Sequence, residues 1–169
     1  MVRTNLRKKE LQKAIELCTW NAQRFINDAR LLMKARSYGH ALSLAILAVE
    51  ETGKKMLLWQ VYFGTLEVEV ALSQDFFFSH PKKLVEVLKS SVQLISIRAN
   101  REKMLKLVNG ISRDLYEDKL EGLYVNIKAG LATSPRKVTC QKAKDVISFA
   151  ESMVSLSTTP LGIILSKQR

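Results

Sequence analysis

A repeat of apolar side chains near the N-terminus places the strongest constraint on how this chain can fold. The repeated residues follow one another at alternating steps of four and three: Leu11, Ile15, Cys18, Ala22, Phe25, Ala29 and Leu32. Such a repeat keeps one stripe of a helix against a partner helix over several turns. We therefore expect a first helix from about residue 5 to about residue 36, with Cys18 in its packed stripe.

A second helical segment follows almost at once. Small and apolar residues recur at helical spacing from Ala41 through Ala45 and Ala48 to Gly53. This pattern predicts a helix over about residues 39–63 with one face buried against close neighbours. The link at residues 37–39 is too short for anything except a tight reversal, so the two helices should lie antiparallel.

The middle of the chain continues with helical spacing after an interruption. Gly64 ends the second pattern, and residues 66–78 are expected to form a connection with one short helical piece. Ser79-His80-Pro81 is typical of a helix entrance, with His80 at the cap, because proline suits the first helical position. Apolar residues then recur over 84–97 and again over 104–115, including Ile111, with a kink or break expected near 100–103.

The C-terminal third contains an extended segment and a final helix. Residues 122–127 have strand-like composition, and residues 130–135 are typical of a loop. A last helix, ended by Pro160, is indicated by a set spaced again by four and three: Ala143, Ile147, Ala150, Val154 and Ser157. We therefore expect an all-α, antiparallel up-and-down four-helix bundle with a short extended excursion before the last helix. Residues 1–169 should form a single domain, with the tail at 158–169 docked or flexible.

Composition excludes several classes of protein. The chain has 47% hydrophobic and 25% charged residues, as an ordinary globular domain does. Its two cysteines, Cys18 and Cys140, form no CxxC pair, which argues against a zinc site or a disulfide framework and favours a reducing, cytoplasmic setting. No apolar run is long enough to span a membrane. No phosphate loop, metal-ligand spacing or catalytic triad is present, so no cofactor and no metal are expected.

The charge is strongly positive and unevenly distributed. There are 27 Lys and Arg against 16 Asp and Glu, for a formal net charge of +11. Such a field attracts polyanions, which makes RNA a natural partner, with Arg98, Arg101 and Lys103 as candidate contacts. An acidic island interrupts it: Asp114, Glu117, Asp118 and Glu121. The competing interpretation, a basic surface that only aids solubility, stays open at this point because aromatic residues make up just 7%.

His80 is the best candidate for chemistry. A helix N-terminus disfavours the imidazolium form, which would leave a neutral ring able to accept a proton. In a metal-independent cleavage of RNA, His80 would take the proton of the 2′-hydroxyl while Lys82 or Lys83 offsets charge on the phosphorane. The competing interpretation is a helix cap beside two solvated lysines.

Two glutamates near the end of the second helix form a candidate polar cluster with Lys54. Glu50 with Lys54, and Glu51 with Lys55, are both i,i+4 pairs in the favourable orientation. Both glutamates also lie near the packed face, and a buried carboxylate requires a partner. We expect a structural ion pair or hydrogen-bonded cluster, with any buried charge met from another helix by a partner such as Arg24, Arg30 or Arg113.

An ordered set of residues across about two thirds of the chain resembles the HEPN superfamily, and within it the AbiV-type abortive infection proteins. The matching residues are Asn21-Ala22, Asp28-Ala29, Leu32, Tyr38, Ala41, Leu44-Ala45, Ala48, Glu50-Glu51, Gly53-Lys54, Phe77, His80, Lys83-Leu84, Gly122-Leu123-Tyr124-Val125-Asn126 and Pro135. The resemblance implies an antiparallel helical bundle that pairs into a homodimer, binds or cuts RNA or an RNA-containing machine, and acts in defence against bacteriophage.

One feature of catalytic HEPN proteins is missing. They carry Arg and His separated by four to six residues on one helix, whereas Arg36 and His40 have only three residues between them and the stretch ending at His80 begins with Asp75. The alternative is therefore a non-catalytic dimeric module that binds a protein partner. The stripe from Leu11 to Leu32 and the apolar tail at 161–165 would supply the surface for it.

Overall fold

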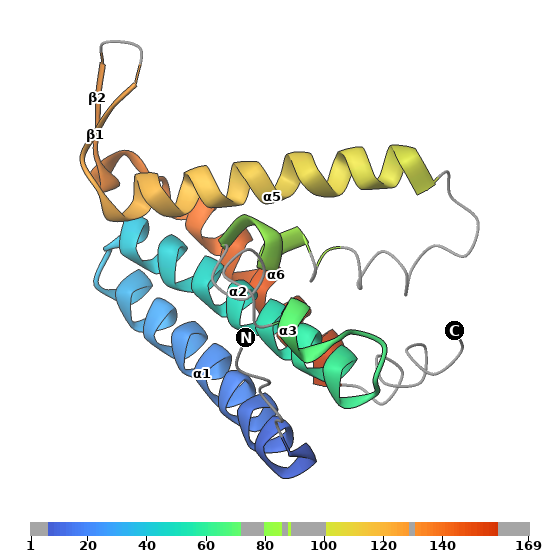
Figure 1. Ribbon diagram of the computed structural model, residues 1–169. Coiled ribbons are helices and arrows are strands. Elements are labelled where there is room, and N and C mark those ends of the chain that lie inside the picture. The colour runs from blue at the N-terminus through green and yellow to red at the C-terminus, as the bar shows by residue number, and fades with distance from the viewer. Residues whose placement is uncertain (1–6, 72–79, 86–87, 89–100, 129–130, 159–169) are drawn as a thin grey trace.

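The computed structural model describes residues 7–71, 80–85, 88, 101–128 and 131–158. Its elements are α1 (Lys8–Lys34), α2 (Tyr38–Tyr62), α3 (Val68–Ala71), α5 (Arg101–Leu123), β1 (Asn126–Lys128), β2 (Leu131–Thr133), the 3-10 turn η1 (Pro135–Lys137) and α6 (Cys140–Thr158) (Figure 1). Residues 80–85 and 88 are also helical. The predicted helical fold class is confirmed. The up-and-down order of four helices stays a prediction, because most of 86–100 lies outside the described residues.

Helix α2 is the centre of the molecule. It packs against α1, α5 and α6 (Figure 1), and its largely apolar sequence is buried on nearly every side. The predicted reversal before it is a short turn in which Arg36 takes a left-handed φ of 57° and the amide of Ser37 donates to the carbonyl of Leu32 at 2.9 Å. Helices α1 and α2 therefore run antiparallel, as the short link required.

The apolar repeat of α1 matches the structure except at Phe25 and Leu32, which are only partly buried. Leu11, Ile15, Cys18, Ala22 and Ala29 are buried, but Ile26 takes the fully buried position that the repeat assigned to Phe25. The reason is that a straight helix turns once per 3.6 residues, so a strict 3.5-residue stripe drifts around it. In α6 the predicted stripe is buried throughout: Ala143, Ile147, Ala150, Val154 and Ser157.

Two glycines bring α5 against the start of α2. A Cβ atom on Gly122 would lie 2.3 Å from Oγ of Ser43 and 2.4 Å from the carbonyl oxygen of Gly39, so any larger residue would push the helices apart. The hydroxyl of Ser43 lies 2.9 Å from the carbonyl oxygen of Lys119. This close approach fixes the last two turns of α5 beside α2.

The segment between α5 and α6 differs from the prediction in detail. Gly122 and Leu123 end α5 instead of starting a strand, and Leu131–Thr133, expected within a loop, pair antiparallel with Asn126–Lys128. Glycine contact with α2 keeps the helix continuous, and cross-strand pairing cannot be seen in a three-residue composition. Ile111 lies on α5, as the helical spacing predicts, but it is 38% exposed, while Val108 and Leu115 of the same stretch are buried.

Other predictions fall partly outside the description. Leu84 and Leu88 are buried, but residues 86–87 and 89–97 of the predicted 84–97 helix, the tail at 159–169 and Phe77 lie outside the described residues. Within the described ranges, no helix combines the length and the apolarity needed to cross a bilayer.

Candidate functional site

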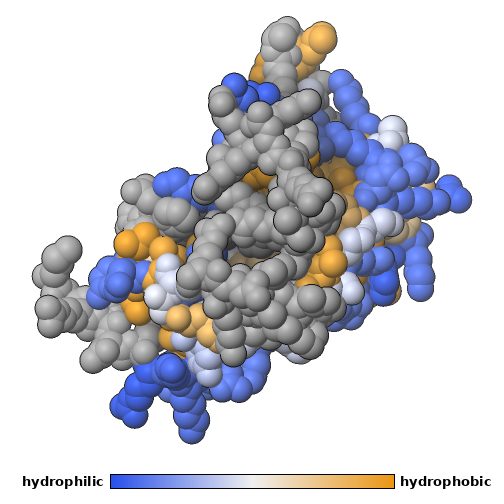
Figure 2. Space-filling model, turned by 90° about the vertical axis from the view of Figure 1, so that its right-hand side faces the viewer, coloured by the Kyte–Doolittle hydropathy of each residue, from blue (hydrophilic) through white to orange (hydrophobic). Residues whose placement is uncertain are grey.

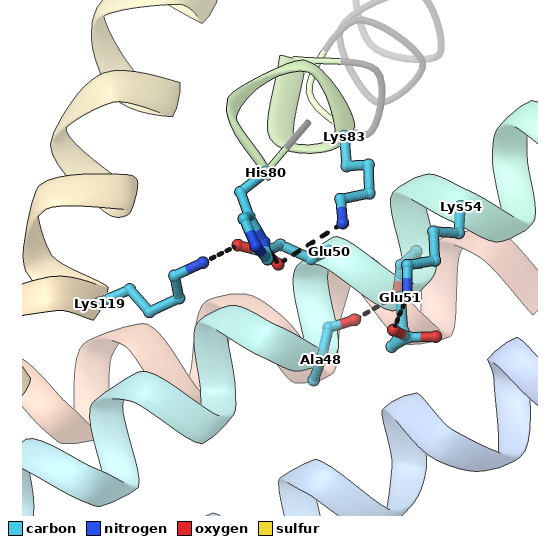
Figure 3. Close-up of polar contacts among 8 residues, drawn as sticks. Ala48, Glu50, Glu51, Lys54, His80, Lys83 and Lys119 are labelled. Carbon is cyan, nitrogen blue, oxygen red and sulfur yellow. Dashed lines mark hydrogen bonds and ion pairs between the residues drawn. The ribbon is translucent and has the colours of Figure 1, made fainter. Parts of the chain in front are cut away.

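A buried carboxylate on α2 gathers cations from two other helical segments. The side chain of Glu50 is only 2% exposed. Nζ of Lys119, on α5, donates to its Oε1 at 2.6 Å, and Nδ1 of His80 lies 2.5 Å from its Oε2. Nζ of Lys83 lies 3.9 Å from the same Oε2. Figure 3 shows the three side chains converging on Glu50.

The partners of Glu50 are not those expected from the sequence. Arg24 pairs with Asp28, Arg30 with Glu151 and Arg113 with Asp114. A surface arginine reaches solvent-exposed carboxylates more easily, whereas Glu50 faces α5 and the segment that begins at His80. An isolated carboxylate at this depth would cost several kcal/mol, so nearby ammonium groups are required by the burial itself.

Both lysines of this cluster are buried with the carboxylate. Lys83 is 3% exposed and Lys119 is 4% exposed. Desolvation lowers the pKa of Lys83 from its ordinary value, and the charge of Glu50 opposes that shift. Two lysine side chains thus share one carboxylate next to His80.

His80 is the part of the cluster that reaches the surface. Its side chain is 46% exposed, and its ring stacks on Tyr116 with the centroids 6.2 Å apart. A carboxylate at Nδ1 selects the tautomer in which Nδ1 donates, which leaves Nε2 as a proton acceptor. His80 is the first described residue of its helix, and residue 79 lies outside the described residues, so the predicted cap position stays a prediction. Glu50 is the side chain that orients the ring.

The predicted polar cluster of Glu50, Glu51 and Lys54 divides between two faces of α2. Glu51 pairs with Lys54, three residues on (Figure 3), and not with Lys55 as expected. Nζ of Lys55 instead donates to Oγ of Ser157 on α6 at 3.1 Å. Successive residues of a helix project about 100° apart, which explains why neighbouring glutamates have different partners.

The Glu51 side of α2 contains two groups with shifted pKa values. Burial, followed by the nearby Glu51 carboxylate, raises the pKa of Cys18 to about 11. Burial lowers the pKa of Lys55 to about 8. Both shifts favour the uncharged form, as expected for groups enclosed between α1, α2 and α6.

The remaining predicted site residues are spread more widely. Lys82 is exposed next to His80, whereas Lys83 points into the core. Arg101 and Lys103 belong to α5, but their side chains, and all of Arg98, lie outside the described part of the chain. Within that part, no three His, Cys, Asp or Glu side chains gather as a metal site would require.

Sequence reasoning missed Tyr116 and Lys119. A signal for Lys119 was present, because it occupies a stripe of α5 with steps of four and three in which all other members are small or apolar: Val108, Ser112, Leu115, Lys119 and Gly122. All five residues of that stripe are buried. A lysine inside such a stripe needs a buried acid, and Glu50 is the corresponding residue of α2.

Comparison with known proteins identifies the family. No significant match was found among curated proteins or among solved structures. The family model HEPN_AbiV, described as AbiV, matches residues 10–155, a range that includes α2, α5, nearly all of α1 and the four residues Glu50, His80, Lys83 and Lys119. The chain belongs to the HEPN_AbiV family.

Proposed function

We propose that this chain is a HEPN-type abortive infection protein that acts on RNA through the site around His80. Membership of the HEPN_AbiV family supports a role in defence, and HEPN domains commonly dimerise and act on RNA. The observation that carries the proposal is the contact between buried Glu50 and half-exposed His80. We further propose one domain over residues 1–169, built as an antiparallel four-helix bundle and paired into a homodimer.

The geometry supports a general-base step. Nε2 of His80 takes the proton of a ribose 2′-hydroxyl, the resulting oxygen attacks the adjacent phosphorus, and the 5′-oxygen of the next nucleotide leaves. The products are a 2′,3′-cyclic phosphate and a 5′-hydroxyl end, once a proton has been returned to the leaving oxygen. Glu50 holds the ring through Nδ1 and stabilises the imidazolium that forms.

The lysines have separate roles in this proposal. Lys82 is exposed beside His80 and is suited to contact a phosphate from solution. Lys83 and Lys119 neutralise Glu50 and leave positive potential behind the ring. Arg98, Arg101 and Lys103 would extend the contact with RNA along the chain, as the sequence predicts.

The test is cleavage of a structured RNA by purified protein in the presence of a chelator. Wild-type protein and His40→Ala should cut the RNA, and His80→Ala should not. His40 is a matched control, because it is the only other histidine and it contacts Ser37 at the surface, on the first turn of α2. If the wild-type protein leaves the RNA intact, the proposed cleavage step is contradicted.

If the protein binds RNA without cutting it, the proposed function is RNA binding alone. Affinity for RNA should then fall by about tenfold or more between low and moderate salt, because each neutralised phosphate releases counterions.

The exposed apolar residues between α5 and α6 favour a second candidate function, a dimeric module that binds a protein partner without catalysis. Absent or salt-independent RNA binding would favour that alternative.

A further inference from the structure

The β1–β2 ribbon exposes apolar side chains on both of its faces. Ile127 pairs with Ala132 and Lys128 pairs with Leu131, so Ile127 and Leu131 project from opposite faces. Ile127 is 74% exposed and Leu131 is 71% exposed, and Tyr124 and Val125 before β1 are exposed as well. The ribbon stands away from the helices in Figure 1, and hydrophobic atoms mark its end at the top of Figure 2.

A ribbon of two short strands has little stability by itself. Such hairpins normally need a third strand or a helix to cover at least one face. In this chain the ribbon is an extension of the bundle, and its large aliphatic side chains lie in water instead of on α5. A surface with this much exposed apolar area is typical of a contact with another macromolecule.

The charges around the ribbon indicate what that macromolecule is. Arg136 and Lys137, directly after β2, are exposed and basic. Helix α5, directly before β1, carries the acidic island, in which Asp114 and Glu117 are exposed, and Ile111 lies one turn earlier. Ile111 is 38% exposed and lies three residues before Asp114, at the border between the acidic island and the buried residues Val108 and Leu115.

A two-fold symmetric contact requires one patch to carry both halves of the interaction. The ribbon, followed by the basic residues Arg136 and Lys137, and α5, with its acidic island, meet that condition. Most of this +11 chain would repel a second copy. The acidic island would also repel the phosphates of RNA, which argues against nucleic acid as the occupant.

We propose that the ribbon of one copy packs on the acidic face of α5 in a second copy, and that the reciprocal contact closes a homodimer. This inference rests on the proposed function for its homodimer and specifies the surface that forms it. Ile127 and Leu131 supply the apolar contact, and Arg136 and Lys137 face Asp114 and Glu117 of the second copy.

Charge reversal gives a decisive test. The first variant carries Arg136→Glu and Lys137→Glu, and the second carries Asp114→Lys and Glu117→Lys. Each variant alone opposes like charges at both contacts, so its self-association should weaken by roughly tenfold or more relative to wild type. An equimolar mixture has opposite charges at both contacts and should return to twice the 19.2 kDa chain mass. Sedimentation at low salt measures all four samples.

Three outcomes would overturn the inference. These are a wild-type protein that stays at 19.2 kDa, a variant that dimerises as well as wild type, and a mixture that dimerises no better than its components. A second pair of variants tests the apolar part. Ile127→Ser with Leu131→Ser should weaken dimerisation by at least about tenfold with unchanged circular dichroism, whereas Leu17→Ser, at an exposed leucine of α1, should change nothing.

The RNA assay separates this inference from the proposed function. If the wild-type protein dimerises but neither binds nor cuts RNA, the proposed function is contradicted and the proposed interface still stands. If the protein cuts RNA and both charge variants dimerise normally, only the proposed interface is contradicted.

Discussion

Two neighbouring glutamates on α2 lead to two different polar environments. Glu50 faces α5 and the segment at His80, where it meets two buried lysines and a histidine that reaches the surface. Glu51 pairs with Lys54 of its own helix and lies beside the thiol of Cys18. Both are carboxylates near the core, but one joins segments distant in sequence and the other acts mostly within its own helix.

The difference shows which of the two clusters is suited to chemistry. On the Glu50 side, a half-exposed histidine is oriented by a buried carboxylate, which is the arrangement that the proposed proton transfer requires. On the Glu51 side, burial raises the pKa of Cys18 and lowers the pKa of Lys55, and neither group reaches the surface as His80 does. We therefore expect the Glu50 cluster to govern both stability and activity, and the Glu51 cluster to affect stability alone.

The largest effect is expected from removing one glutamate at a time. Glu50→Gln leaves Lys83 and Lys119 without a carboxylate and should lower the free energy of unfolding by about 3–5 kcal/mol. Glu51→Gln removes a pair with a partly exposed lysine of the same helix and should cost about 1 kcal/mol or less. Urea denaturation followed by circular dichroism gives both values. Equal losses in the two variants would contradict the division between the faces.

A double-mutant cycle would sharpen the comparison at Lys119. Lys119→Met keeps the side-chain volume in the α5 stripe but removes a charge 2.6 Å from Glu50, and should cost about 2–4 kcal/mol. The double variant with Glu50→Gln should cost less than the sum of the single variants, by about 1–3 kcal/mol. Lys54→Met is the matched control on the other face. Additive losses at Glu50 and Lys119 would show that the pair contributes no coupling.

The sequence predicted the elements of this fold better than their partners. The repeat in α1 and the stripe in α6 depend on local spacing, which a linear pattern displays directly. The pairing of Glu50 with Lys119 joins residues 69 positions apart and depends on the packing of Gly39 against Gly122. His80 was found as a candidate, but the group that orients it was not, because only the tertiary structure shows that Glu50 faces it.

A smaller effect is expected in the pH dependence of stability. Burial lowers the pKa of Lys55 to about 8 in the folded chain from its ordinary value of 10.5, so above pH 8 the unfolded chain binds more protons at this residue. Stability should therefore rise with pH, by about 1 kcal/mol between pH 8 and 9. Above pH 9 the raised pKa of Cys18 acts in the opposite direction. The Lys55→Met variant should show a clearly smaller rise of the free energy of unfolding with pH. A part of the rise will persist, because the pKa of Lys83 is also lowered.

The smallest effect distinguishes the two cysteines by reactivity. Cys18 is buried between α1 and α2 with a pKa of about 11, whereas Cys140 is partly exposed at the start of α6. Because the thiolate is the nucleophile, iodoacetamide at pH 8 should modify Cys140 at least about tenfold faster than Cys18. Peptide mass spectrometry over time measures both rates in the wild-type chain, and urea-unfolded protein should show nearly equal rates. A Cys18 that reacts as fast as Cys140 under native conditions would mean that the Glu51 face of α2 opens to solvent, and the contrast between a closed face and one that reaches the surface through His80 would no longer hold.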